Sequence, residues 1–232
     1  MPLPKIETPT YELTVPSTGE LIEFRPFLVK EEKILMLAQE SGGVKDMIRA
    51  LKQIISSCTF EKVNPDSLAS YDLEYIFLQL RAKSVGESSK FQLKCEKCGE
   101  FNPVEIDLTT IEVVFPLEKD DNTIQLTDNV GVVLRSIHLD EIENIGENVE
   151  DFTKILALTI DKIFDDTQVY NSSDISNKEL IEFVESLSRS QVSKIENYIE
   201  NQPYLEKIVE FQCKECGHHN SVQLRGLDSF FG

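Results

Sequence analysis

Apolar residues recur at every third or fourth position along several stretches of the chain, a spacing typical of amphipathic helices. Within residues 30–41, for example, the expected helix carries Ile34, Leu35, Leu37 and Ala38, and Gly42-Gly43 separates it from the next helix. The same reasoning predicts helices over residues 30–41, from 44 onward, and over 71–83, 140–145, 152–163, 177–187 and 190–201.

Two segments predict strand pairs that end in an arginine. Residues 10–25 and 122–135 each have the pattern strand, turn, strand, and they end at Arg25 and Arg135. Each arginine leads into an expected helix. The pattern of the first part of the chain therefore recurs in its second part.

Four of the five cysteines form two CxxCG motifs, Cys95–Cys98 before Gly99 and Cys213–Cys216 before Gly217. In such a zinc knuckle two thiolates converge on one ion, and glycine permits the sharp backbone turn beneath them. Strand-like residues flank both motifs, as in a zinc ribbon. The motifs lie far wider apart than the ~15–20 residues of the compact zinc-ribbon pattern.

The wide separation is accounted for if the chain is an internal duplication. We interpret it as an α+β protein of two similar repeats, each with two strands, helices and then strand, knuckle, strand. The first repeat covers residues 1–118, with its recognisable pattern starting near residue 8, and the second covers 119–232. A pseudo-twofold arrangement would bring both knuckles to one zinc-ribbon-like site of four cysteines. The alternative is that both halves merely share common α+β patterns.

Zinc is the ligand that this cysteine pattern favours, with Cys95, Cys98, Cys213 and Cys216 as its ligands. Four thiolates leave no open coordination position, so we expect one structural zinc ion per chain. A redox pair and a structural disulfide are the alternatives. A redox CxxC usually lies at a helix N-terminus, whereas these motifs lie between strands.

The other candidate residues have simpler interpretations. His218 and His219 could replace a thiolate, but two complete knuckles already satisfy zinc. His138 and Cys58 are expected to be structural, Cys58 as a small buried hydrophobe. Asp120-Asp121 and Asp165-Asp166 are expected in loops, because no phosphate-binding glycine loop, HExxH or GxSxG motif accompanies them. The sequence thus indicates no active site and predicts a protein that is not an enzyme.

Charge excludes two classes of partner. The 41 acidic and 23 basic residues give a net charge of −18, which repels nucleic acid and anionic membranes. We find no apolar stretch of membrane-spanning length and no secretory signal, and therefore expect a protein of a reducing cytoplasm. A basic protein surface is the partner that this charge would attract.

Apolar residues at two places are candidates for contact with a partner protein. Pro26, Phe27 and Leu28 follow the first arginine, and Phe230-Phe231 nearly ends the sequence. The aromatic pair has two interpretations: it folds back as a last strand onto its own core, or it anchors in a pocket of another protein.

A family resemblance rests on residues 22–41, with the run FRPFLVKEEK, on residues 79–86 and on the Cys95–Cys98 knuckle. These segments resemble the small baseplate hub family of T-even-type contractile-tailed bacteriophages. The resemblance implies a viral protein made in the host bacterial cytoplasm and needed to build the tail baseplate hub. Its implied partners are other hub or tail proteins. It leaves open whether the protein stays in the virion baseplate or acts only as an assembly factor or chaperone.

Two other functions remain open at this point. A zinc-ribbon regulator that binds the transcription machinery should present a basic surface beside its knuckles. Lys94, Lys97 and Lys214 lie there, but Glu96, Glu100, Glu210 and Glu215 offset them. A hydrolase would need a pocket with perturbed carboxylates.

Overall fold

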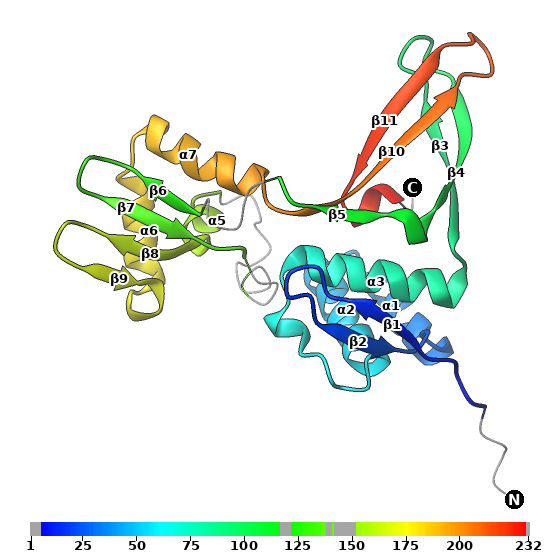
Figure 1. Ribbon diagram of the computed structural model, residues 1–232, viewed down its shortest axis with the longest axis horizontal. Helices are drawn as coiled ribbons and strands as arrows, with labels where there is room; N and C mark the ends of the chain where they lie inside the picture. Colours follow the sequence, from blue (N-terminus) through cyan, green and yellow to red (C-terminus); the bar gives the residue numbers. More distant parts are fainter. Residues whose placement is uncertain (1–5, 117–121, 138–140, 142–151, 231–232) are drawn as a thin grey trace, which may run out of the picture. The chain divides into compact units, whose positions relative to one another are not determined.

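The computed structural model describes residues 6–116, 122–137, 141 and 152–230 (Figure 1). The chain divides into two compact units, of which the first comprises Met1–Val114 with Tyr204–Gly232 and the second comprises Phe115–Pro203. Both cysteine motifs therefore belong to the first unit. The units do not follow the boundary at residues 118 and 119 that we expected between two repeats, and the duplication itself stays a prediction.

The first unit opens with a hairpin, three helices and a ribbon of longer hairpins. Its elements are β1 (Tyr11–Thr14), β2 (Leu21–Phe24), α1 (Val29–Ser41), α2 (Val44–Cys58), α3 (Ser70–Val85), β3 (Ser88–Lys94), β4 (Phe101–Asp107), β5 (Glu112–Val114), β10 (Tyr204–Gln212) and β11 (His219–Arg225). The 3-10 turns η1 (Pro65–Ser67), η2 (Leu108–Thr110) and η4 (Leu227–Phe230) connect or follow them. β3 pairs with β4, and β10 pairs with both β11 and β5, all antiparallel.

The core of this ribbon region packs against α3. Leu78 of α3, Leu108 of η2 and Leu205 of β10 are fully buried in one cluster with residues from β4 and β11. The strand β5, which we did not predict, aligns Val114 with Tyr204 and so joins the two distant parts of the first unit. No helix of the described residues is long and apolar enough to cross a membrane.

The second unit contains one four-stranded antiparallel sheet and three described helices. The sheet has the order β6 (Thr123–Gln125), β7 (Gly131–Leu134), β8 (Ile160–Phe164) and β9 (Val169–Asn171). The helices are α5 (Phe152–Leu158), α6 (Asn177–Glu185) and α7 (Arg189–Glu200), with η3 (Ser172–Asp174) before α6. Val132, Leu134 and Ile160 of the sheet and Ile195 of α7 have no exposed surface and form its core.

The predicted helix over residues 152–163 is wrong in its second half. α5 ends at Leu158, and Ile160 and Ile163 lie in β8. The hydroxyl of Thr159 donates to the Leu156 carbonyl at 2.7 Å, while its own carbonyl accepts from the Arg135 N–H at 2.8 Å. These contacts end the helix and place the following residues in the sheet, where β-branched residues such as Ile160 and Ile163 pack well. The expected helix over 140–145 lies outside the described residues except for Glu141.

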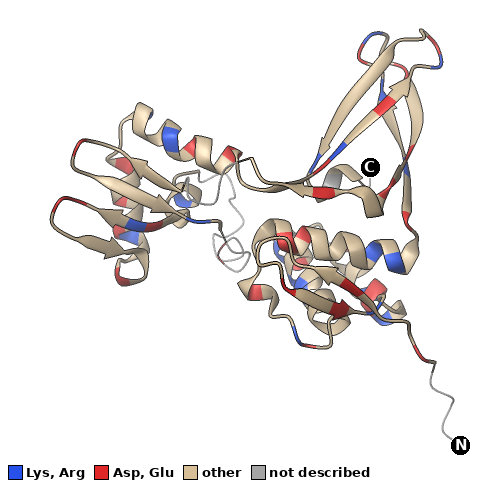
Figure 2. Cartoon of the chain, in the orientation of Figure 1, with Lys and Arg blue, Asp and Glu red and all other residues tan. Residues whose placement is uncertain are grey.

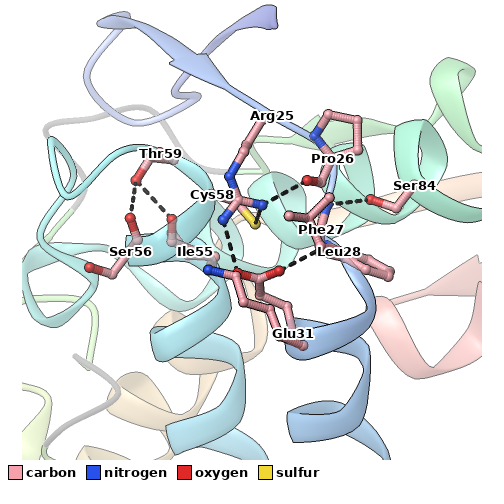
Figure 3. Close-up of polar contacts among 11 residues, drawn as sticks. Arg25, Pro26, Phe27, Leu28, Glu31, Ile55, Ser56, Cys58, Thr59 and Ser84 are labelled. Carbon is pink, nitrogen blue, oxygen red and sulfur yellow. Dashed lines mark hydrogen bonds and ion pairs between the residues drawn. The ribbon is translucent and has the colours of Figure 1, made fainter. Parts of the chain in front are cut away.

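Arg25 connects the first hairpin to two helices (Figure 3). Its guanidinium donates to the Glu31 carboxylate at 2.9 Å, to the Pro26 carbonyl at 2.9 Å and to the Cys58 sulfur at 3.7 Å. Its N–H donates to the Cys58 carbonyl at 2.9 Å. Glu31 also accepts from the Leu28 N–H at 2.8 Å, which caps the start of α1. We call these contacts the Arg25 clamp.

A similar clamp occurs in the second unit. Arg135 also follows a hairpin, donates to the carbonyl of the next residue, Ser136, and pairs with the carboxylate six positions on, that of Glu141. Its N–H donates to the carbonyl of Thr159, just after α5, as that of Arg25 does to Cys58 at the end of α2. In each unit an arginine after a hairpin thus contacts the next carbonyl, a carboxylate six positions on and, through its N–H, a carbonyl at or just after the end of a helix.

The Glu31 side chain should be important for stability, because it is buried together with Arg25. Burial alone would raise the pKa of Glu31, but hydrogen bonds from Arg25, Leu28 and Lys30 outweigh it and hold the pKa below its ordinary value. We expect Glu31→Gln to lower the free energy of unfolding by about 3–5 kcal/mol, since it leaves the Arg25 charge buried without its partner. Urea unfolding at neutral pH measures this.

The control is Glu32→Gln, an exposed position on the same helix, which should change stability little. Because the folded pKa of Glu31 is lowered, its stabilising contribution is present above the ordinary carboxyl range. It is lost as pH falls through the folded value. Equal effects of the two variants, or a Glu31→Gln effect that persists at a pH where wild-type Glu31 is protonated, would contradict this account.

Candidate metal centre

Both cysteine motifs form the same tight turn. The Cys95 N–H donates to the Glu100 carbonyl at 2.8 Å, and the Cys213 N–H donates to the His218 carbonyl at 2.8 Å. Gly99 and Gly217, one residue after each motif, have φ of 77° and 67°, a left-handed conformation that favours glycine. β3 and β4 support the first turn, and β10 and β11 support the second. Each turn presents its two sulfurs in the same direction from the end of a hairpin.

The two turns meet, and their four sulfurs form one cluster. Cys95 Sγ lies 3.7 Å from Cys216 Sγ, and Cys98 Sγ lies 3.6 Å from Cys213 Sγ. All four sulfurs lie within 4.8 Å of one another. A tetrahedral zinc ion with Zn–S bonds of about 2.3 Å separates its sulfurs by about 3.8 Å. The cluster could therefore hold a metal ion such as zinc.

Two buried asparagines, four residues after each motif, connect the turns crosswise. Asn102 belongs to the first hairpin, but its Oδ1 accepts from the Lys214 N–H at 2.9 Å and its Nδ2 approaches Cys213 Sγ at 3.6 Å. Asn220 belongs to the second hairpin, and its Oδ1 accepts from the Glu96 N–H at 3.0 Å. Asn220 also hydrogen-bonds the Cys95 thiol. We call this reciprocal pair the asparagine brace; sequence reasoning missed it, although CxxCGxxN occurs twice.

The surroundings of the sulfurs favour thiolates at the two buried cysteines. The N–H groups of Cys216 and Glu215, opposed by burial, lower the pKa of Cys213 to about 6. Burial opposes ionisation of Cys95 too, but N–H groups of Cys98 and Lys97 and the Asn220 side chain lower its pKa. At Cys98, the Glu100 N–H lowers the pKa, but the neighbouring thiols raise it to about 12. A cation at the centre would favour the thiolate form of the cysteines that bind it.

Comparison of the sequence with known protein families shows to which family the chain belongs. Residues 8–232 match the model of the family described as T4 bacteriophage base plate protein. The chain belongs to this family. No curated protein and no solved structure matched the chain. The match makes the protein a T4-type phage baseplate protein, a coarser statement than the hub subunit that the sequence resembles.

None of the other sequence candidates for chemistry in the described part of this baseplate protein belongs to the sulfur cluster. The metal-competent group in the described residues contains no histidine; His218 and His219 are in the second hairpin beyond Gly217. Cys58 is fully buried, as expected, and burial raises the pKa of its thiol to about 11. Asp165 lies in the turn between β8 and β9. His138 and Asp120-Asp121 lie outside the described residues.

The two predicted partner-contact segments differ in exposure. Phe230 has no exposed surface, and its carbonyl accepts from the Ser89 hydroxyl at 2.7 Å. It folds back onto the core in a 3-10 turn, not a strand, so its side chain is not available as an anchor. Phe231 lies outside the described residues. Pro26 and Phe27 are half-buried and Leu28 is 40% exposed, which leaves an accessible segment beside the Arg25 clamp.

The asparagine brace should tighten metal binding. Replacing Asn102 by Ala removes the acceptor for the Lys214 N–H and a contact to Cys213, and Asn220→Ala does the same for Glu96 and Cys95. Changes in the residues that orient metal ligands typically cost about 10- to 100-fold in affinity. We expect a loss of this size from each variant, measured by zinc competition with a chelator. Asn129→Ala, an exposed control in the second unit, should bind as tightly as wild type, and brace variants that do the same would contradict this role.

Proposed function

We propose that this protein is a non-enzymatic component or assembly factor of the phage baseplate hub, with one structural zinc ion per chain. The observation that carries the proposal is the family match over residues 8–232, which places the chain among baseplate proteins. The hub, as distinct from other parts of the baseplate, rests on the sequence resemblance described above. Its partners would be other hub or tail proteins. It would contact them in the host cytoplasm during assembly and, if it remains in the finished particle, in the virion tail.

Zinc would act in this protein as a structural link. Cys95, Cys98, Cys213 and Cys216 fill a tetrahedral shell, so no position remains for a water or substrate. The ion would join the end of the β3–β4 hairpin to the end of the β10–β11 hairpin. Its binding free energy would then contribute directly to the stability of the folded ribbon.

The zinc proposal predicts one ion per chain after purification without chelator. Cys213→Ser should abolish stoichiometric binding and lower the apparent free energy of unfolding by several kcal/mol, because metal binding is coupled to folding. Elemental analysis and native mass spectrometry measure the stoichiometry. Cys58→Ser is the matched control: it removes a buried thiol outside the cluster and should retain the zinc. Two ions per chain, or metal kept by Cys213→Ser, would contradict the closed site.

The described cavities support a non-enzymatic function. A cavity of about 590 Å³ lies between β6 and α7, and its polar lining is hydroxyl and amide groups with one cation, Lys194. Lys194 donates to the Gln125 carbonyl at 2.6 Å. A second cavity, of about 400 Å³, is lined by Lys154 and by Glu141, and Glu141 pairs with Arg135. Neither combines a free acid, a base and a nucleophile in the manner of a hydrolase.

Charge near the knuckles weighs against the alternative, a regulator of transcription machinery. Lys214 pairs with Glu100 at 3.3 Å across the two turns, so acidic side chains offset the lysines there. The sequence of the second unit is strongly acidic, with 19 acidic and 7 basic residues and a net charge of −12. Figure 2 colours the acidic and basic residues of its described part. A net charge of this sign favours a basic protein partner over nucleic acid.

We further propose that the chain arose by duplication, with repeats at residues 1–118 and 119–232. The two clamps, at Arg25 and Arg135, and the two knuckles with their asparagines follow the same order in both repeats. The compact units would then differ from the repeats for a physical reason. The knuckle hairpin of the second repeat leaves its own half to complete the sulfur cluster with the first.

The hub proposal is tested in infected cells. A tagged chain should co-purify with baseplate hub and tail proteins, and mass spectrometry of purified particles decides between a virion component and an assembly factor. Cys213→Ser should reduce recovery in these complexes in proportion to its loss of folded protein. Recovery with host RNA polymerase in place of tail proteins would overturn the proposal in favour of the regulator. An untagged infection treated identically is the control.

A further inference from the structure

The helix α1 has apolar residues on two opposite faces. Its inner face buries Ala38 and partly buries Ile34 and Leu35. Its outer face exposes Val29 by 66%, Met36 by 55% and Leu37 by 65%. A helix that is apolar on both sides is normally covered on both. In the described residues nothing covers the outer side.

Two opposite charges complete this outer face. At 100° per residue, Lys33 and Glu40 fall within the same stripe, about 100° wide, as Val29, Met36 and Leu37. Both are exposed, and neither has an ion pair among the described residues. We call Val29, Lys33, Met36, Leu37 and Glu40 the outer face of α1.

The order of these residues is self-complementary. If a second α1 packs antiparallel, with a twofold axis between positions 36 and 37, Met36 meets Leu37 of the second copy and Lys33 meets its Glu40. The twofold axis generates each contact twice. Two central apolar contacts flanked by two ion pairs result, and Val29 then lies opposite position 44, just after the Gly42-Gly43 turn. A parallel arrangement would place like charges together.

We propose that the outer face of α1 docks on the same face of a second copy of this chain. The net charge of −18 opposes self-association, but two thirds of it lies in the second unit. The first unit, which carries α1, has a net charge of only −6. With a Debye length of about 8 Å at physiological ionic strength, the remaining repulsion is largely screened.

The expected complex is a weak dimer. One face of a 13-residue helix covers less than the ~800 Å² per partner of a standard interface, so we expect a dissociation constant of about 10–100 µM. Sedimentation equilibrium of the zinc-loaded full-length chain should show a mass rising from 26.4 kDa toward twice that value with concentration. Leu37→Glu should keep the chain monomeric and leave its melting temperature unchanged, because Leu37 contributes little to the core.

A charge-swap series tests the antiparallel register. Lys33→Glu and Glu40→Lys each convert two attractive contacts into repulsive ones, and each should weaken dimerisation about 5- to 10-fold. The double variant, Lys33→Glu with Glu40→Lys, restores both pairs and should recover most of the affinity. Val169→Glu, a 60% exposed position in the second unit, is the control and should dimerise normally.

Four results would overturn the proposal. A wild-type chain that stays monomeric at several hundred micromolar contradicts self-docking. A dimer that Leu37→Glu leaves intact uses another surface. A double charge swap that remains as weak as the single variants contradicts the antiparallel register. If the wild-type chain is monomeric and a folded Leu37→Glu variant is no longer incorporated into baseplates, the face binds a different baseplate protein.

Discussion

The convergence of two cysteine turns from distant parts of the sequence is the constraint on which the first unit depends. Sulfurs that are 118 positions apart in the sequence must lie within 4.8 Å of each other, so the β10–β11 hairpin must return to the β3–β4 hairpin. The pairing of β10 with β5 meets this requirement, and the core around α3 forms beneath it. The structure therefore has one ribbon region made from both parts of the first unit.

This closure also explains where the second unit can be inserted. Val114 and Tyr204 are partners in the β5–β10 register, so the chain leaves the first unit and re-enters it at neighbouring positions. An inserted segment with adjacent ends needs no particular contact with its host. The second unit correspondingly has its own sheet, its own core and its own Arg135 clamp. The charge of the protein is also concentrated in it.

The sequence alone was sufficient to predict the elements whose local residue pattern is strong. The CxxCG motifs identified all four cysteines of the sulfur cluster, and residue spacing located α1, α2, α3, α6 and α7. It failed at residues 159–164, because apolar residues there fit a helical face while the Thr159 carbonyl pairs with Arg135 in the sheet. It also missed β5 and β9, because three residues each carry too little pattern. The helix error and the missed β5 occur where long-range pairing decides the structure.

The asparagine brace was missed for a different reason. Asn102 and Asn220 are polar residues within strands, and a polar residue in a strand ordinarily indicates a solvent-facing position. Here they are buried because each satisfies a backbone N–H of the opposite turn, a relation that is visible only once the turns are placed together. For Phe230 the sequence left two interpretations open, folding back onto its own core and anchoring in a partner. The residue is fully buried, so it folds back, although in a 3-10 turn and not in a strand.

Loop-closure entropy shows why these additional contacts are needed. Closing a loop of 118 residues costs about 1.8 kcal/mol more than closing the roughly 16-residue loop of a compact ribbon, by the (3/2)RT ln n relation. The β5–β10 pairing reduces that cost before any metal binds, since it fixes Tyr204 beside Val114 and shortens the remaining free segments. From Tyr204 on to Cys213 the chain is almost entirely strand, and from Val114 back to Cys98 two strands are joined by the 3-10 turn η2 and end at the knuckle turn. The asparagine brace then fixes the last few residues. A metal ion bound at the four cysteines would therefore act on hairpins that the protein has already brought together, and it would stabilise their register.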